Sequence, residues 1–196
     1  MSNPWLPASA QAEAGPVTDE DLSPLTGPAA PQPGSAPPVD RTELLQELVP
    51  TETSGLWVIG AHGGAGETTV AELLGGTATQ RRWPRAEPPA PVLLVARTHA
   101  RGLRAAQLAM RAWAAGQTPP AELIGLLLVA DAPRRAPKPL AQLASTLAGG
   151  VPRCWHLGWV PELRITTSVV NLQLSRRDRR PLDQIQSVVS NITKEN

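Results

Sequence analysis

The residues with the clearest chemical potential form one glycine-rich segment, Gly60-Ala-His-Gly-Gly-Ala-Gly-Glu-Thr-Thr-Val70. It follows the short apolar run 56–60 and precedes a helical pattern over 67–74, so it lies where a strand turns into a helix. Closely spaced glycines let backbone N–H groups turn toward an anion, and a helix N-terminus adds partial positive charge. The segment therefore predicts a loop that can bind a phosphate or another small oxyanion.

This loop resembles that of the ParA/MinD branch of P-loop ATPases, which reads K-G-G-x-G-K-T-T. Five positions match that pattern: Gly63, Gly64, Gly66, Thr68 and Thr69. Both lysines of the branch are replaced, because His62 stands at the signature lysine and Glu67 at the phosphate-binding lysine. Ala61 also departs from the first glycine of the general G-x-x-x-x-G-K-[ST] pattern, so the Walker A loop is degenerate. The A-H-G-G-A-G loop is also similar to that of an uncharacterised bacterial subfamily, which brings no assigned activity.

The resemblance continues with lower specificity over about residues 56–165. Segment 95–107 is similar to the strand and helix that follow the nucleotide-responsive switch of the branch. Segment 124–131 is similar to a later strand, where the branch often places a polar residue that contacts the base. The resemblance implies a nucleotide site formed by His62, Gly63, Gly64, Ala65, Gly66, Glu67, Thr68, Thr69 and Asp131.

The metal site of the resembled branch is harder to find. Residues 77–90 contain no apolar strand that ends in Asp, so the usual magnesium-ligating aspartate is missing from its expected place. Asp131 is a rival because it follows the apolar run 123–130, although an Asp that caps the turn before Pro133 explains it equally well. Thr68 and Asp131 are therefore metal ligands only if a magnesium–nucleotide complex binds.

Glu67 decides the interpretation of the loop. One charge pair at about 4 Å and an effective dielectric constant of about 20 is worth roughly 4 kcal/mol. Reversing the lysine charge therefore costs on the order of 8 kcal/mol before relaxation, which approaches the whole free energy of micromolar binding. We expect Glu67 to be held by Arg97, by His62 or by the N–H groups of the loop, which leaves no room for a triphosphate.

Three functions follow from these observations. The favoured one is a degenerate ParA/MinD-like P-loop protein that acts as a binding or regulatory module, with little or no ATP hydrolysis, no catalytic residue and no cofactor. The first alternative is an active ATPase of the same branch in DNA partitioning or cargo positioning, with ATP and magnesium as cofactors and with His62 and Asp131 as substitute charges. The second alternative is an α/β domain that binds something other than a nucleotide.

The wider pattern alternates strands and helices. Apolar runs predict strands over 56–60, 91–96, 123–130 and 154–160, and amphipathic patterns predict helices over 67–74, 102–115, 140–147 and 181–192. Uninterrupted apolar strands that alternate with helices predict an α/β fold with a short parallel sheet flanked by helices, which is P-loop NTPase-like by the resemblance. Ligands of such sheets bind beyond the carboxyl ends of the strands.

The first 40 residues differ from the rest. They hold nine prolines and five acidic residues but no Lys or Arg, which predicts a disordered acidic tail over 1–40 and a P-loop-like domain over 41–196. A short helix over 40–50, capped by Asp40 or Thr42, is expected to begin that domain. The tail is either a solvated leader or an acidic arm that competes for a basic face of the domain.

Composition excludes several other classes. The formal net charge of +1 excludes a strongly basic nucleic-acid footprint over the whole chain, and one cysteine, Cys154, excludes an internal disulfide framework. The three histidines are too scattered for a zinc pattern. With neither a secretory signal nor a membrane span, we expect a cytoplasmic protein with a protein partner, possible homodimerisation and only indirect contact with nucleic acid. For the charge run Arg176–Arg180 two interpretations stay open: it contacts a phosphate or an acidic partner, or it forms a solvated face without a binding role.

Overall fold

The computed structural model describes residues 26–52, 54–166, 168–169 and 172–195. Its main sheet has five parallel strands in the order β3-β2-β5-β6-β7. These strands are β2 (Trp57–Gly60), β3 (Thr77–Ala78), β5 (Pro91–Arg97), β6 (Glu122–Val129) and β7 (Cys154–Leu157). The predicted α/β class with a parallel sheet is therefore confirmed, although β7 ends at Leu157 and not at residue 160.

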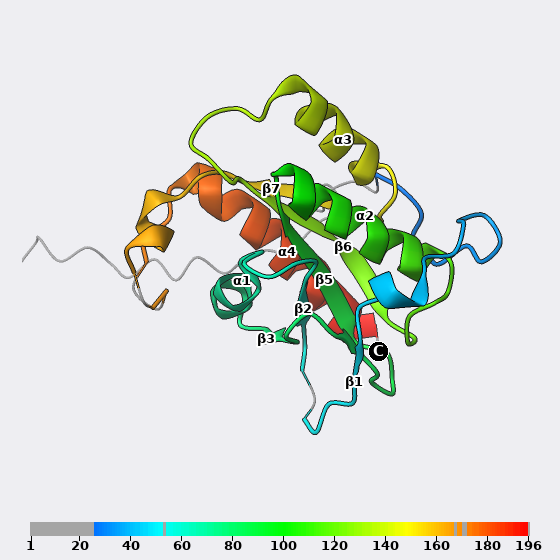
Figure 1. Cartoon of the computed structure of the whole chain (residues 1–196). Coiled ribbons are helices and arrows are strands. Elements are labelled where there is room, and N and C mark those ends of the chain that lie inside the picture. Colours follow the sequence, from blue (N-terminus) through cyan, green and yellow to red (C-terminus); the bar gives the residue numbers. More distant parts are fainter. Residues whose placement is uncertain (1–25, 53, 167, 170–171, 196) are drawn as a thin grey trace, which may run out of the picture.

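Helices cover both faces of this sheet (Figure 1). On one face, α1 (Glu67–Leu74) and α4 (Arg176–Glu195) pack through Val70, Leu74, Ile185 and their apolar neighbours. On the other face, α2 (Ala100–Ala114) and α3 (Lys138–Ala148) pack through side chains such as Leu103. The strands are buried on both sides, which explains why their sequences read as continuous apolar runs.

The order of the strands creates a switch point between β2 and β5. From β2 the chain passes through α1 to β3 on one side, whereas β5, β6 and β7 follow on the other side. In open α/β sheets, ligands bind at the carboxyl ends of the strands where the connections diverge in this way. The glycine-rich loop after β2 and the segment after β5 meet at this point.

The segment between residues 40 and 50 is not the predicted helix. Asp40 does cap a first turn, because its carboxylate accepts the N–H of Thr42 at 2.8 Å, but this turn is only the short 3-10 helix η2 (Arg41–Glu43). The chain then forms β1 (Glu47–Leu48), which pairs with β4 (Trp83–Pro84) in a separate two-stranded sheet. Pairing with a distant strand overrides the local helical pattern there, because it satisfies backbone groups that an exposed short helix leaves to water.

The expected tail lies partly outside the described residues, which begin at residue 26. Residues 26–40 contact the domain: the N–H of Thr26 donates to the carbonyl of Pro152 at 2.8 Å, and Gln117 binds both backbone groups of Val39. Val39 is buried. The contacts with the domain therefore begin before residue 41, although composition places residues 26–40 in the tail.

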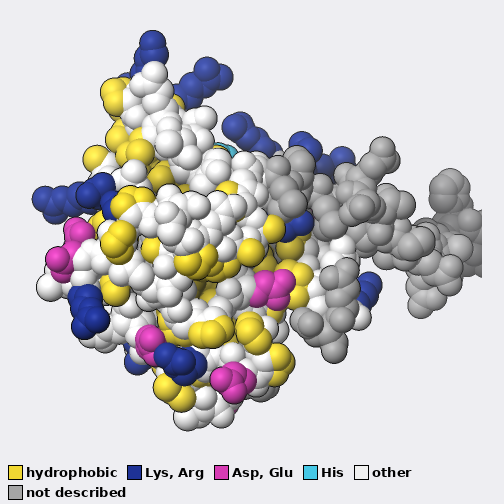
Figure 2. Space-filling model, turned by 90° about the vertical axis from the view of Figure 1, so that its right-hand side faces the viewer, with side chains coloured by type: hydrophobic (Ala, Val, Ile, Leu, Met, Phe, Trp, Pro, Cys, Tyr) yellow, Lys and Arg dark blue, Asp and Glu magenta, His cyan; other side chains and the backbone are white. Residues whose placement is uncertain are grey.

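The surface face drawn in Figure 2 carries side chains of several kinds. On the face shown in Figure 2, acidic and basic side chains are interspersed with apolar ones. No helix among the described residues is long and apolar enough to cross a membrane.

Candidate functional site

The glycine-rich loop between β2 and α1 turns on two glycines in left-handed conformations. Gly64 has φ +77° and Gly66 has φ +97°, values that residues with a Cβ rarely adopt. Within the described part of the chain, the N–H groups of Gly63, Gly64, Gly66 and Thr68 have no protein acceptor. Backbone donors at the N-terminus of α1 therefore remain open to an anion.

Glu67, the first residue of α1, has partners that the sequence did not predict. Its Oε1 accepts the backbone N–H of Thr79 at 2.8 Å, the backbone N–H of Arg81 at 3.1 Å and the hydroxyl of Thr79 at 3.2 Å. The expectation that Arg97, His62 or the loop would hold Glu67 was wrong. The carboxylate reaches across the end of β2 to the chain that leaves β3, so it does not fill the phosphate position of the loop.

The turn after β3 is built to hold this carboxylate. Gln80 and Arg81 both have positive φ, 56° and 61°, which is uncommon for residues with a side chain. Thr79 is fully buried, and Arg82 braces the turn by donating from Nε to the carbonyl of Thr79 at 3.2 Å. Two residues that carry the site, Thr79 and Arg81, were therefore missed by sequence reasoning. The only available signal was a threonine among the few residues between the first helix and the second apolar run.

His62 joins the loop to β5 in its neutral form. Its Nε2 accepts the backbone N–H of Arg97 at 3.1 Å, so Nδ1 carries the proton and donates to the carbonyl of Gly63 at 2.8 Å. Burial lowers the pKa of His62, and the nearby His99, Arg81 and Arg97 lower it further, against the opposing effect of the Gly63 carbonyl. A histidine fixed as an acceptor does not replace the positive charge of a lysine.

The ring of His62 is closely packed. It contacts the ring of His99 edge to face, with 4.9 Å between the centroids. His99 in turn caps α2, because its Nδ1 accepts the N–H of Gly102 at 2.9 Å. A Cβ on Gly102 would lie 2.8 Å from Nε2 of His62 and 2.4 Å from the carbonyl oxygen of Arg97. Only glycine allows α2 to start this close to the loop.

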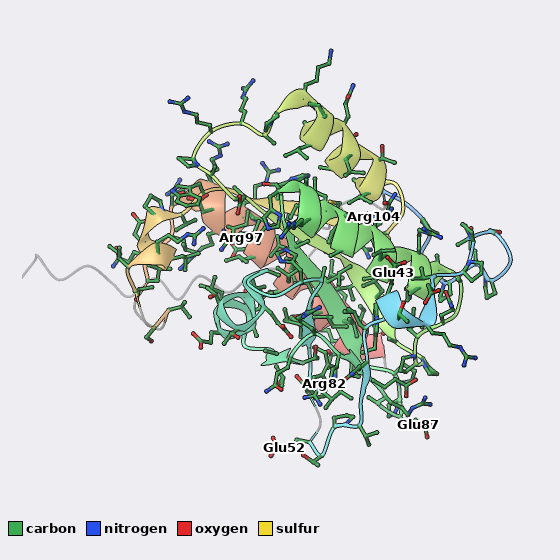
Figure 3. All side chains as sticks on the ribbon, viewed as in Figure 1. Glu43, Glu52, Arg82, Glu87, Arg97 and Arg104 are labelled. Carbon is green, nitrogen blue, oxygen red and sulfur yellow. The ribbon has the colours of Figure 1, made fainter. Side chains whose placement is uncertain are left out.

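Arg97, at the end of β5, connects three segments (Figure 3). Its Nε donates to the carbonyl of Gly64 at 3.2 Å and its Nη1 to the carbonyl of Ala130 at 3.1 Å. Burial lowers the pKa of Arg97 and Arg164 lowers it further, whereas Asp131 raises it. Arg97 is thus a cation that the fold brings to the glycine-rich loop, and it already holds the carbonyl of Gly64.

Asp131 follows strand β6, whereas the glycine-rich loop follows β2. Strand β5 lies between these two strands in the sheet, so Asp131 is one strand further from the loop than Arg97 is. Its side chain is exposed, and its backbone N–H donates to the hydroxyl of Thr98 at 3.1 Å. No group of three or more His, Cys, Asp or Glu side chains is positioned to hold a metal ion among the residues that the structure describes.

Cavities of more than 500 Å³ lie elsewhere on the protein. One of about 510 Å³ opens at the amino ends of β2 and β5, between Trp57, the prolines 88, 89 and 91, and Ile192. The other, of about 690 Å³, lies between Leu73 on α1, Leu182 on α4 and the segment that contains Leu172. Neither cavity includes residues of the glycine-rich loop.

The fold and the loop together define an α/β protein with a glycine-rich strand-to-helix turn at the switch point of a parallel sheet. The chain belongs to a family of unknown function, DUF6668, whose model matches residues 54–176. That range includes the loop, Thr79, Arg97 and Asp131. Neither the curated proteins nor the solved structures give a significant match to the chain.

Proposed function

We propose that this protein is a degenerate member of the ParA/MinD-like P-loop proteins, with a P-loop NTPase-like fold. It acts as a binding or regulatory module toward a protein partner and hydrolyses ATP little or not at all. The observation that carries this proposal is the carboxylate of Glu67. It stands at the position of the phosphate-binding lysine and is engaged by Thr79 and Arg81 instead of a ligand.

The charges around the loop support weak anion binding over phosphoryl transfer. Phosphoryl transfer depends on a lysine and a metal ion that neutralise the charge developing on the transferred group. Here the first residue of α1 is acidic, His62 is neutral, and Arg97 already donates to two carbonyl groups. The open N–H groups of the loop can hold an oxyanion, but they supply none of the missing charge.

The neutral state of His62 also weakens the alternative of an active ATPase. In that alternative His62 and Asp131 supply the missing charges. Protonated His62 would lose its bond with the N–H of Arg97, and Asp131 has no side-chain contact with the loop among the described residues. The proposal therefore favours the degenerate module over the enzyme.

Calorimetric titration with Mg-ATP, Mg-ADP and Mg-GTP tests this proposal. We expect no magnesium-dependent binding in the micromolar range, and no phosphate release above the rate of buffer alone. Tight, magnesium-dependent binding of any of the three nucleotides would overturn the proposal and favour the ATPase. Titration with inorganic phosphate measures anion binding by the loop alone, because phosphate has no nucleobase and requires no metal site.

A further inference from the structure

Charge is distributed unevenly between the two edges of the main sheet. Because all five strands are parallel, the segments that follow them lie at the carboxyl edge. The described parts of these segments hold thirteen Lys or Arg residues and four Asp or Glu residues: 61–67, 79–82, 97–104, 130–138, 158–166 and 172–180. Segment 40–52, at the opposite edge, holds four acidic residues and one Arg. The near-zero net charge of the chain therefore conceals a strongly basic edge.

The densest part of this surface lies where α3 and α4 begin. We call it the basic edge and define it by five exposed side chains: Arg134, Arg135, Lys138, Arg176 and Arg177. Nitrogen-tipped side chains project from the loop before α3 in Figure 3. An excess of positive charge at one end of the sheet favours contact with an anionic partner.

Two carboxylates nearby are bound by neutral donors and not by the cations of the basic edge. Glu67 is bound by backbone N–H groups, and Asp178 accepts the hydroxyl of Ser175 at 2.6 Å at the start of α4. An ion pair of 2.7 Å joins Glu47 on β1 to Arg85, just after β4, away from the basic edge. The cations of the basic edge therefore have no carboxylate within ion-pair distance in the described part of the chain.

The chain carries an acidic segment of matching charge outside the described residues. Residues 1–25 contain four acidic residues and no Lys or Arg, and three of the acids are consecutive, at Asp19, Glu20 and Asp21. A segment attached to the same molecule is present at an effective concentration in the millimolar range. No separate partner at cellular concentration has that advantage.

The point of attachment brings these acids within reach of the basic edge. Thr26 is bonded to the carbonyls of Val151 and Pro152, just before β7. From there to the end of β7 the chain spans about 20 Å, at about 3.3 Å per residue. Residues 19–21 lie five to seven positions before Thr26, a reach of up to about 17–25 Å. The carboxyl end of β7, beside which α3 and α4 begin, is thus within the span of an extended chain from Thr26 to Glu20 or Asp19.

We propose that the basic edge is a docking surface for the acidic residues 19–21 of the same chain. The segment covers the basic edge and competes with other polyanions for it. This inference does not rest on nucleotide binding, because it concerns the starts of α3 and α4 and not the glycine-rich loop.

The two lysines of the chain provide an internal control for the test. Lys138 belongs to the basic edge, whereas Lys194 lies at the far end of α4. A carbodiimide joins a carboxylate directly to an amine that it contacts. In the full chain at low salt, we expect residues 19–21 to be cross-linked to Lys138 at least fivefold more than to Lys194. At 1 M salt, where the Debye length falls to about 3 Å, this preference should disappear.

A charge variant separates attraction from simple proximity. Arg134→Gln with Arg135→Gln leaves both reacting groups in place and should reduce the Lys138 cross-link to the level of Lys194. The exposed Arg41 on η2 provides the matched control, and Arg41→Gln should leave the cross-link unchanged. Equal cross-linking of the two lysines in the wild-type chain would overturn the proposal. So would cross-links that form mainly between differently isotope-labelled copies, because these identify a second copy as the occupant.

Competition provides a second measurement on the full chain. Asp19→Asn, Glu20→Gln and Asp21→Asn together should tighten binding to heparin or to a short DNA duplex several-fold at 50 mM salt. Wild-type and variant proteins that bind these polyanions equally would show that the basic edge is free for nucleic acid and is not covered by the segment.

Discussion

The carboxylate of Glu67 accepts the backbone N–H of Thr79 at 2.8 Å and so ties the first turn of α1 to the chain that leaves β3. The same oxygen also accepts the N–H of Arg81 in a turn with two consecutive left-handed residues. The acidic residue that makes the loop a poor nucleotide site is therefore a structural link between two loops. Its replacement has consequences for stability as well as for binding.

Glu67→Lys should destabilise the protein by about 2 kcal/mol, because it leaves the N–H groups of Thr79 and Arg81 without their acceptor. Urea unfolding measures this change. Glu67→Gln keeps an amide oxygen at the same place and should cost about 1 kcal/mol or less. If the two variants are equally stable, the bonds of Glu67 do not contribute to the fold. We also expect Glu67→Lys to gain measurable nucleotide binding by calorimetry, and no gain would count against the degenerate P-loop interpretation.

Gly102→Ala should destabilise the protein by about 2 kcal/mol or more, although Gly→Ala inside a helix normally stabilises. The added Cβ would lie 2.4 Å from the carbonyl oxygen of Arg97, a backbone atom that cannot move freely. Gly63→Ala is the matched control, since a Cβ there meets no atom within 4 Å. Thermal or urea unfolding of both variants gives the comparison. A Gly102→Ala protein as stable as the control would contradict the close packing of α2 against His62.

The part that His62 plays in stability should depend on pH. Burial lowers its pKa in the folded protein, so the unfolded chain binds the proton more readily. The stabilisation is therefore complete above the ordinary histidine pKa of about 6.5 and is lost as pH falls through the lower folded pKa. His62→Gln keeps an acceptor near the N–H of Arg97 but does not titrate, so its stability should fall less between pH 7.5 and 5. His156, whose pKa is also lowered by partial burial, titrates in both proteins and cancels in this comparison. Parallel pH curves for the two proteins would exclude a role for His62.

Cys154 should react very slowly with thiol reagents. Burial raises its pKa from the ordinary 9.0 to about 12, and the thiolate is the reactive form. At pH 8 we expect alkylation of the folded protein to be about a thousandfold slower than that of the urea-unfolded chain. An exposed cysteine introduced by Ser190→Cys serves as the control and should react at the ordinary rate. Rapid labelling of Cys154 in the folded protein would show that β7 opens often.

Sequence predicted well those strands and helices whose bounds are determined by residues close together in the chain. The apolar run before Gly60 and the helix that Gly75 ends were both placed within a residue or two, because burial pattern and helix-ending glycine are local signals. The helix expected over 40–50 was wrong because β1 pairs with a strand more than thirty residues away. The partner of Glu67 was also out of reach, because Thr79 meets it only through the order of the strands.

The position of α4 has a consequence for the order in which the protein can fold during synthesis. Its side chains Leu182, Ile185 and Val188 complete the core over Val58 and Leu127, yet they are synthesised after every strand of the main sheet. A nascent chain that ends before residue 176 has made every strand of the sheet but leaves much of one apolar face without its cover. A ribosome paused at that point would therefore present an exposed apolar surface to chaperones, and the native packing is reached only once α4 has been synthesised.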